Sequence, residues 1–291
     1  MKILLLGKNG QVGGELQTTL AGLGELSAWD RHDLDLSSPD SIREKIRSLR
    51  PDVIVNAAAY TAVDKAESES GLAMAINGTA PGILAEEAAR LDALLVHYST
   101  DYVFDGTKRS PCREQDATNP LSVYGRSKLA GEQAISAQAS RYLIFRTEWV
   151  YDAHGRNFLN TIKRVGAQRS ELTIVDDQIG APTWSREIAR ATAQIIRLYL
   201  GRADQKEVSG IYHLTAQGQT SWFGFAQAAA ECGLFADLAH PPALRAIPSS
   251  EYPTPAQRPM YSVLSNEKLL RQFGIQLPNW KISLQECMGN Q

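Results

Sequence analysis

A tyrosine and a lysine lie four positions apart in the segment Tyr124-Gly125-Arg126-Ser127-Lys128. In a helix these two side chains share one face, because residues four apart are neighbours on its surface. A phenol can deliver a proton to a ketone oxygen while a hydride reaches the carbon. A free tyrosine has a pKa of about 10, and a neighbouring ammonium favours the phenolate. The pair therefore predicts a ketone-reducing site, with Lys128 lowering the pKa of Tyr124.

A hydroxyl residue upstream completes this chemistry. Ser99-Thr100 follows the apolar run Leu94–Tyr98, at the carboxyl end of a predicted strand. From there Thr100 would hydrogen-bond the carbonyl oxygen and orient it. Each residue alone has a structural interpretation: a helix cap for Tyr124, a solvated cation for Lys128 and a strand-end hydroxyl for Thr100. Their coincidence behind a glycine-rich turn favours the catalytic interpretation.

That turn is Gly7-Lys8-Asn9-Gly10-Gln11-Val12-Gly13, which follows an apolar run directly and opens an amphipathic stretch. Glycines let a pyrophosphate approach the backbone, and the helix N-terminus offers free N–H groups. The context of strand, glycines and helix predicts a dinucleotide site. An oxidised nicotinamide held there would further favour the phenolate form of Tyr124.

Two adjacent residues bear on whether the cofactor is NAD or NADP. Asp30 ends the second predicted strand, where a carboxylate can bind ribose hydroxyls and favour NAD. Arg31 comes next and could accept a 2′-phosphate. We therefore predict that both cofactors are usable, with NADPH slightly favoured over NADH.

Short apolar runs alternate with amphipathic stretches through the first 150 residues. This alternation predicts an α/β fold of Rossmann type, a doubly wound parallel sheet with helices on both faces. The predicted strands are Lys2–Leu6, Leu26–Trp29, Val53–Ala57, Leu94–Tyr98 and Tyr142–Arg146. The predicted helices are Gln11–Leu23, Pro39–Leu49, Ala73–Arg90 and Leu121–Ala137.

The pattern changes after Tyr151. We expect a helix over Glu187–Leu200 and a strand over Gly210–Leu214, and then prolines cluster between 241 and 259 and resist regular structure. We predict a dinucleotide-binding domain at 1–150, to which the chain returns at roughly 170–215. The remainder of 151–291 would form a smaller, interleaved C-terminal substrate domain that closes a cleft over the carboxyl edge of the sheet.

Composition narrows the function classes. The chain has 291 residues, 43% hydrophobic content and a net charge of −2, which gives no sign of a nucleic-acid or anionic-membrane surface. No apolar run approaches the ~18 residues that a membrane-spanning helix needs. Three well-separated cysteines, Cys112, Cys232 and Cys287, favour a reducing cytoplasm.

The flanking sequence extends the pattern. The glycine turn, Ser-Thr and Tyr-x-x-x-Lys occur in the order found in extended short-chain dehydrogenase/reductases. Over nearly its whole length, the chain resembles the dTDP-4-dehydrorhamnose reductase family. The resemblance is carried by the segments 55–67, 97–106, 120–132, 145–151, 177–183 and 252–259.

The resemblance implies NAD(P)H-dependent reduction of the 4-keto group of dTDP-4-dehydro-L-rhamnose to dTDP-L-rhamnose. This is the last step of dTDP-rhamnose biosynthesis, which supplies surface polysaccharide such as the O-antigen of lipopolysaccharide. By position, Tyr124 is the proton donor, Lys128 its partner and Thr100 the hydroxyl. Family cofactor contacts fall on Gly10-Gln11-Val12, Asp30, Asp35-Leu36 and Ala59-Tyr60-Thr61; nucleotide-sugar contacts fall on Thr100-Asp101 and Trp149.

Two positions depart from the family pattern. Glu148 lies beside Trp149 where a small residue is more usual, so local substrate contacts would differ. Some relatives bind Mg²⁺ at a dimer contact through glutamates. Glu15 is present here, but Arg186 stands where another ligand would fall, with Glu187 adjacent. We predict no metal, and a homodimer is compatible with the resemblance.

Two alternatives remain open at the level of sequence. One is a related nucleotide-sugar reductase or epimerase with another sugar. The other is a non-catalytic NADP-binding regulatory subunit, which the same superfamily includes. Intact Thr100, Tyr124 and Lys128 argue against the second.

Overall fold

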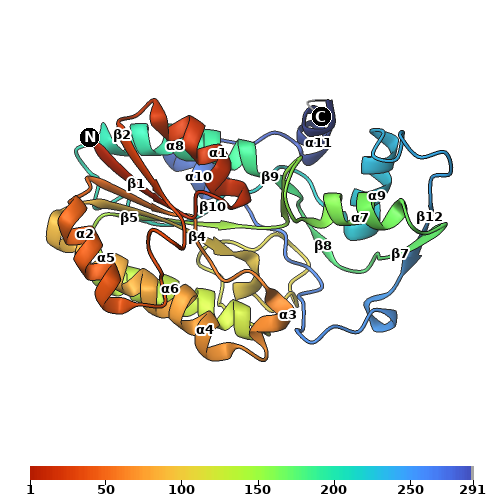
Figure 1. Cartoon of the computed structure of the whole chain (residues 1–291), viewed down its shortest axis with the longest axis horizontal. Helices are drawn as coiled ribbons and strands as arrows, with labels where there is room; N and C mark the ends of the chain where they lie inside the picture. Colours follow the sequence, from red (N-terminus) through yellow and green to blue (C-terminus); the bar gives the residue numbers. More distant parts are fainter. Residues whose placement is uncertain (290–291) are drawn as a thin grey trace.

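A parallel sheet of six strands forms the centre of the larger part of the molecule (Figure 1). The computed structural model describes residues 1–289. Along the sheet the strand order is β10-β5-β4-β3-β1-β2. The strands are β1 (Lys2–Leu6), β2 (Glu25–Trp29), β3 (Val53–Asn56), β4 (Leu94–Thr100), β5 (Tyr142–Thr147) and β10 (Gly210–His213).

Helices cover both faces of this sheet (Figure 1). One face carries α1 (Gln11–Ala21), α8 (Ser185–Leu200) and α10 (Glu267–Phe273), and the other carries α2 (Pro39–Leu49), α5 (Ala80–Leu91) and α6 (Val123–Gln138). Alternate side chains of β1 enter the two resulting cores: Leu5 lies in one and Leu4 in the other. The predicted doubly wound Rossmann-type fold is confirmed.

The predicted helix Ala73–Arg90 is wrong in its continuity. The chain forms α4 (Ser70–Met74), a π-helical turn over Ala75–Thr79 and then α5. Pro81 near the start of α5 has no N–H and crowds the carbonyl four residues earlier, so a regular α-helix cannot run through it. The π turn directs Asn77 toward the Tyr60 loop, where its side chain bonds both backbone groups of Tyr60, and toward the Ser127 hydroxyl of α6.

The remaining elements build a smaller part beside the carboxyl ends of the strands (Figure 1). Its core brings together aromatic side chains that include Tyr151, Trp184 and Phe225. Its elements are β6 (Val150–Tyr151), α7 (Phe158–Gly166), β7 (Glu171–Val175), β8 (Ile179–Gly180), β9 (Thr183–Trp184), β11 (Thr220–Ser221), α9 (Trp222–Glu231), β12 (Ala243–Ile247) and α11 (Trp280–Gly289). The domain boundaries given above stay a prediction.

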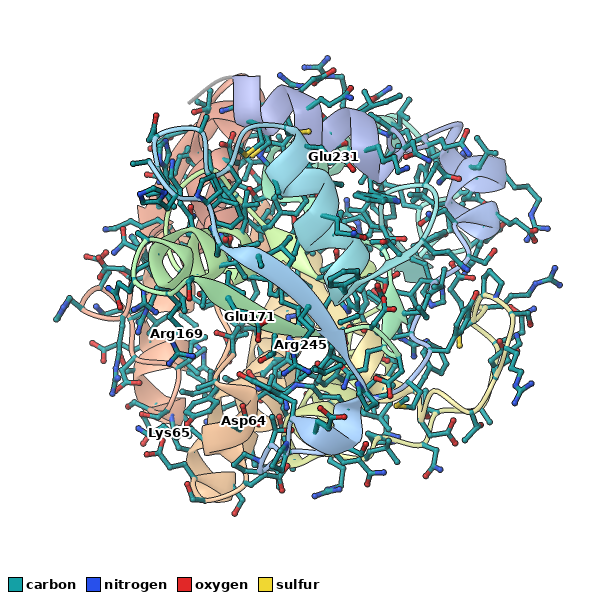
Figure 2. All side chains as sticks on the ribbon, turned by 90° about the vertical axis from the view of Figure 1, so that its right-hand side faces the viewer. Asp64, Lys65, Arg169, Glu171, Glu231 and Arg245 are labelled. Atoms are coloured by element: carbon teal, nitrogen blue, oxygen red, sulfur yellow. The ribbon has the colours of Figure 1, made fainter. Side chains whose placement is uncertain are left out.

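The proline-rich segment is more regular than its composition predicts. Between Pro242 and Pro248 the chain forms β12, which pairs in parallel with β7. The prolines flank the strand, so none removes a ladder hydrogen bond from its interior. On this face Arg245 of β12 lies against Glu171 of β7, with their Nε and Oε1 atoms 3.2 Å apart (Figure 2).

The end of the proline-rich segment is fastened to the larger part. Asp64, in the short helix α3 (Val63–Ala66), accepts hydrogen bonds from the backbone N–H of Ala256 and from the Arg258 guanidinium, at 3.2 and 2.8 Å. Gly106 has a φ of +75°, and a side chain there would collide with Pro259. These contacts place residues 256–260 over the loop that follows β4. Within residues 1–289, no helix is long and apolar enough to cross a membrane.

Candidate active site

A cavity of about 840 Å³ opens where the larger and smaller parts meet at the carboxyl ends of the strands. It joins the glycine turn after β1 to Tyr124 and Lys128 on α6. Ten of the residues predicted from sequence line it: Gly7, Gly10, Gln11, Val12, Asp30, Arg31, Ala59, Thr61, Tyr124 and Lys128. Asp35 and Leu36 line a smaller neighbouring cavity of about 120 Å³, which also includes Arg31.

The glycine turn is packed against backbone on two sides. Gly7 has a φ of +87°, and a Cβ there would lie 2.7 Å from the backbone of Ala58 after β3. Gly13, which does not line the cavity, faces the turn from the first turn of α1; its Cβ would lie 2.0 Å from the Gly7 carbonyl oxygen. Gly10 is different, because its nearest neighbour would be 3.4 Å away. The turn therefore puts no side chain between the N-terminus of α1 and the cavity, so the backbone N–H groups there could bind a pyrophosphate.

We expect Gly13→Ala to lower the free energy of unfolding by at least about 2 kcal/mol, because the new methyl overlaps backbone that cannot move aside. Urea denaturation followed by circular dichroism would measure it. Gly10→Ala is the matched control, with a small change in stability. Equal stability of the two variants would contradict this account of the turn.

The predicted ribose ligand Asp30 is tied into the turn after β2. Its carboxylate accepts hydrogen bonds from the His32 N–H at 2.8 Å and from the Asn9 amide at 3.0 Å, and Lys8 Nζ lies 3.5 Å away. The His32 hydrogen bond, above all, keeps the pKa of Asp30 below its ordinary value. Arg31 is exposed and lines both cavities. A cation therefore reaches the expected adenosine end of the site.

Tyr124 lies near the start of α6, half-buried, with its ring edge-on to Tyr102 at 5.8 Å between centroids. The α6 N-cap is Ser122, whose hydroxyl accepts the Gly125 N–H, so capping is not the role of Tyr124. Burial raises the pKa of Tyr124 to about 12, and a hydrogen bond with Thr100 opposes that rise. This direction is opposite to the prediction from sequence, because desolvation of the phenol exceeds the other effects. The phenol is thus held protonated at neutral pH.

Lys128 lies one turn further along α6 and is only 2% exposed. Its Nζ donates to the Tyr98 carbonyl at 2.5 Å and contacts His97 Nε2 at 3.2 Å. Burial lowers the pKa of Lys128 to about 8, against the opposing charge of Glu132. The ammonium is therefore anchored to β4 rather than solvated.

The surroundings of this lysine include Glu132, Arg146 and His97, for which the sequence predicted no role in the site. Glu132, one turn beyond Lys128, accepts two hydrogen bonds from the Arg146 guanidinium, at 2.9 and 2.6 Å, and one from the Ser99 hydroxyl at 2.5 Å. His97 is fully enclosed, and burial lowers its pKa well below the ordinary value, so its ring is neutral. The sequence offered Lys128 and Glu132 at helical spacing, but their partners come from β4 and β5.

Three further residues lie around these groups. Asn56 contacts His97 Nδ1 at 3.1 Å, so it ties β3 to β4. Tyr60, a predicted cofactor contact, does not line the cavity, and its hydroxyl donates to Glu69 at 2.7 Å. Trp149, with a φ of +45°, stacks on Trp222 with centroids 3.5 Å apart. Its predicted contact with a nucleotide sugar stays a prediction.

Thr100 and Asp101, where β4 ends, are buried and are not among the residues that line the cavity. The Thr100 hydroxyl donates to Asp101 Oδ1 at 2.9 Å and accepts the Tyr102 N–H at 3.1 Å. Burial raises the pKa of Asp101 to about 6. Glu148, the residue that departs from the family pattern, is also buried and accepts the Leu264 N–H at 3.2 Å. The Glu148 side chain faces residues 181 and 262–264, not the solvent.

Glu15 and Arg186 form an ion pair, with 3.3 Å between Arg186 Nε and Glu15 Oε2. Glu187 pairs with Arg190 at 2.8 Å. Within the described residues, no group of three or more His, Cys, Asp or Glu side chains converges in a way that could hold a metal ion. The Arg186 guanidinium thus lies beside Glu15, where the resemblance would place another metal ligand. The expectation that the protein binds no metal stays a prediction.

Comparisons with known proteins cover both parts of the molecule. A family model described as RmlD substrate binding domain matches residues 1–291. A dTDP-4-dehydrorhamnose reductase from Burkholderia thailandensis is 49% identical over 99% of this chain and 98% of that protein. The crystal structure of a dTDP-4-dehydrorhamnose reductase from Clostridium acetobutylicum is similar with a TM-score of 0.90 and 38% identity, over 100% of this chain and 99% of that one. A Bacillus anthracis dTDP-4-dehydrorhamnose reductase in complex with NADP has a TM-score of 0.90 and 32% identity, with the same coverage.

Proposed function

The chain belongs to the RmlD substrate binding domain family, and from this premise we propose that Thr100, Tyr124 and Lys128 carry out its reaction. The protein is an NADPH-dependent oxidoreductase of the dTDP-rhamnose pathway. It reduces the 4-keto group of dTDP-4-dehydro-L-rhamnose to the alcohol and so completes the synthesis of dTDP-L-rhamnose. The observation that carries the residue roles is that Tyr124 and Lys128 line the same cavity as the glycine turn.

The residues present fit a dinucleotide. The bare N-terminus of α1 and Gly10 face the cavity, so they would hold the pyrophosphate. Ala57, Ala58 and Ala59 leave room beside the sheet edge. When bound, the nicotinamide supplies the hydride that adds to C4 of the sugar. Lys128 would hold the nicotinamide ribose from its anchored position beside β4.

Tyr124 supplies the proton. Hydride addition turns the ketone into an alkoxide, and the phenol O–H donates to that oxygen, which leaves a phenolate. Because its pKa is about 12, Tyr124 is fully protonated and ready to donate at neutral pH. Thr100 lies beside the phenol, and because its hydroxyl donates to Asp101 Oδ1 at 2.9 Å it has no second proton for the reacting oxygen in this arrangement. The ammonium of Lys128, one turn away, favours the phenolate that forms.

We propose NADPH as the preferred cofactor, with NADH accepted. Arg31 is exposed at the expected adenosine end, whereas the Asp30 carboxylate is occupied by His32 and Asn9. A guanidinium pairs strongly with phosphate, and this contact is available only to NADPH.

Arg31→Ala is therefore expected to weaken NADPH binding about tenfold, since a charge-assisted hydrogen bond contributes roughly 1.5–3 kcal/mol, and to leave NADH binding nearly unchanged. Fluorescence titration with each cofactor measures both. Arg197→Ala, an exposed arginine on α8 that lines neither cavity, is the matched control. An equal loss with both cofactors would refute the proposed phosphate contact.

The assay that tests the function follows NADPH consumption with dTDP-4-dehydrorhamnose. Turnover of this substrate supports the assignment. Turnover only with another dTDP- or UDP-keto sugar would support a related nucleotide-sugar reductase. NADPH binding without turnover of any of them would support the regulatory subunit.

We also propose a cellular setting and an assembly for the protein. Its three cysteines are free, which suits a reducing cytoplasm. A homodimer is the proposed assembly, and sedimentation velocity of the purified protein would test it.

A further inference from the structure

A loop of the smaller part forms one wall of the cavity. This β6–α7 loop covers residues 152–157, and Asp152, His154, Gly155 and Arg156 line the cavity together with the glycine turn. Gly155 has a φ of +78°, a conformation that residues with a side chain rarely adopt. His154 and Arg156, on either side of it in the chain, are exposed. The sequence predicted no role for this loop.

The conformation of the β6–α7 loop is fixed by amide side chains. Asn157 donates to the backbone carbonyls of Asp152 and His154, at 2.8 and 3.2 Å, and accepts the Asn160 N–H at 2.9 Å as the N-cap of α7. Asn160 donates in turn to the Gly155 carbonyl at 3.1 Å. The loop is therefore a built part of the cavity wall.

The loop is also joined to the N-terminus of α1. Gln11, the first residue of that helix, accepts a hydrogen bond from Asn157 Nδ2 at 2.9 Å and donates to the Val150 carbonyl at 3.3 Å. Both polar atoms of the Gln11 side chain thus hold the chain on the two sides of the loop. The backbone N–H groups at this helix end are the proposed pyrophosphate site. Arg156, the neighbour of Asn157, lines the cavity beside them.

The cavity has few cations to offset the negative charge of a pyrophosphate. Among the described residues, the lysines and arginines that line it are Arg31, Lys128 and Arg156. Lys128 is buried against β4, and Arg31 also lines the smaller cavity at the expected adenosine end. Arg156 is the remaining cation, and within residues 1–289 its guanidinium has no ion pair or hydrogen bond.

The acidic residues that line the cavity have partners of their own. Glu15 pairs with Arg186, with 3.3 Å between Oε2 and Nε, and Asp152 accepts the Ser185 hydroxyl. Asp30 is tied into the turn after β2. None of these carboxylates engages the Arg156 guanidinium, which is therefore left for an anion bound in the cavity.

We propose that Arg156 binds the pyrophosphate of the cofactor from the smaller part, while the N-terminus of α1 binds the same group from the larger part. A guanidinium offers two parallel N–H groups to a phosphate. The inference takes the cofactor from the proposed function and adds a ligand to it. The pyrophosphate is common to NADH and NADPH, so Arg156 contributes affinity without cofactor preference, whereas Arg31 is proposed to contact the 2′-phosphate of NADPH.

Arg156→Ala should weaken the binding of NADPH and NADH by the same factor, about tenfold, because both lose a charge-assisted hydrogen bond. Fluorescence titration without a sugar substrate measures both affinities. Arg156→Lys should recover part of the loss, since it keeps the charge but not the paired N–H groups. Arg169→Ala is the matched control: this arginine is exposed on the smaller part, between α7 and β7, and lines neither cavity (Figure 2).

Fragments of the cofactor locate the contact. ADP-ribose contains the pyrophosphate, so Arg156→Ala should weaken its binding about tenfold. The binding of 2′-AMP, which has the 2′-phosphate and no pyrophosphate, should be unchanged in Arg156→Ala and weakened in Arg31→Ala. Competition titrations against NADPH measure both fragments, and dTDP is tested in parallel because the nucleotide sugar also carries a diphosphate.

The outcomes separate this inference from its rivals and from the proposed function. A loss confined to NADPH and 2′-AMP would assign Arg156 to the 2′-phosphate, and a loss confined to dTDP would assign it to the nucleotide sugar; either result overturns the proposal, as does unchanged binding of every ligand. The expected losses in a protein that does not reduce the keto sugar would retain the inference and remove the proposed function. Normal turnover with cofactor binding that does not depend on Arg156 would do the reverse.

Discussion

Replacing Tyr124 by phenylalanine is expected to lower kcat by at least about 10²-fold, the usual scale for a positioned general acid. The substitution removes only the hydroxyl, because the edge-on packing against Tyr102 involves the ring. Hydride addition would then leave an alkoxide with no donor beside it. Stopped-flow and steady-state measurements with NADPH and dTDP-4-dehydrorhamnose provide the value. The Kd for NADPH should be nearly unchanged, since the ring that lines the cavity remains.

Tyr102→Phe is the matched control, because it removes the other hydroxyl of the same ring pair. That hydroxyl interacts with Arg258 rather than Thr100. A much smaller loss of kcat is expected. Near-normal turnover of Tyr124→Phe would show that another group, with Thr100 as the first candidate, donates the proton.

The strands of the central sheet could be predicted from the sequence for a simple reason. Buried parallel strands are apolar on both faces, so runs such as Val53–Val55 are visible without any partner. The same logic placed Thr100 at the carboxyl edge, since strand ends of a parallel sheet meet there. In the smaller part, strands β8, β9 and β11 have two residues each, too few to establish a period. Their pairing depends on contacts made by distant segments.

Long-range contacts also explain what was missed in the site. Lys128 was recognisable by its spacing from Tyr124, but its acceptors lie 30 and 31 residues away on β4. The direction of the Tyr124 pKa shift depends on how deeply the phenol is enclosed, which residue types do not reveal. Glu148 stood out in the sequence only as a departure. The hydroxyl that donates to it belongs to Ser262, more than a hundred positions later.

Lys128→Met is the second large effect, and its expected signature is loss of function without loss of fold. Without the ammonium, the phenolate of Tyr124 loses its stabilising charge and the cofactor ribose loses a ligand. We expect kcat to fall by about 10²-fold or more and the affinity for NADPH to fall as well. Single-turnover kinetics and fluorescence titration measure the two effects independently.

The stability of this variant follows from the buried charge. The pKa of Lys128 is lowered from 10.5 to about 8, a difference that corresponds to roughly 3 kcal/mol against the protonated folded state. Below pH 8 the lysine is charged in both folded and unfolded states, so this cost is fully present; it diminishes as pH rises from 8 toward 10.5, where only the unfolded state is protonated. Methionine removes the cost but leaves the Tyr98 carbonyl without its donor, at about 1–3 kcal/mol.

These two changes nearly cancel, so Lys128→Met should unfold in urea close to the natural protein at pH 7 and be less stable than the natural protein by pH 10, where the cost of the buried ammonium has largely gone. Lys163→Met, at a partly exposed site on α7, should leave activity and stability alone. A variant that loses turnover but keeps full affinity for NADPH would remove the ribose contact from the proposed role of Lys128. A variant that unfolds would show instead that the ammonium is needed to hold β4 against α6.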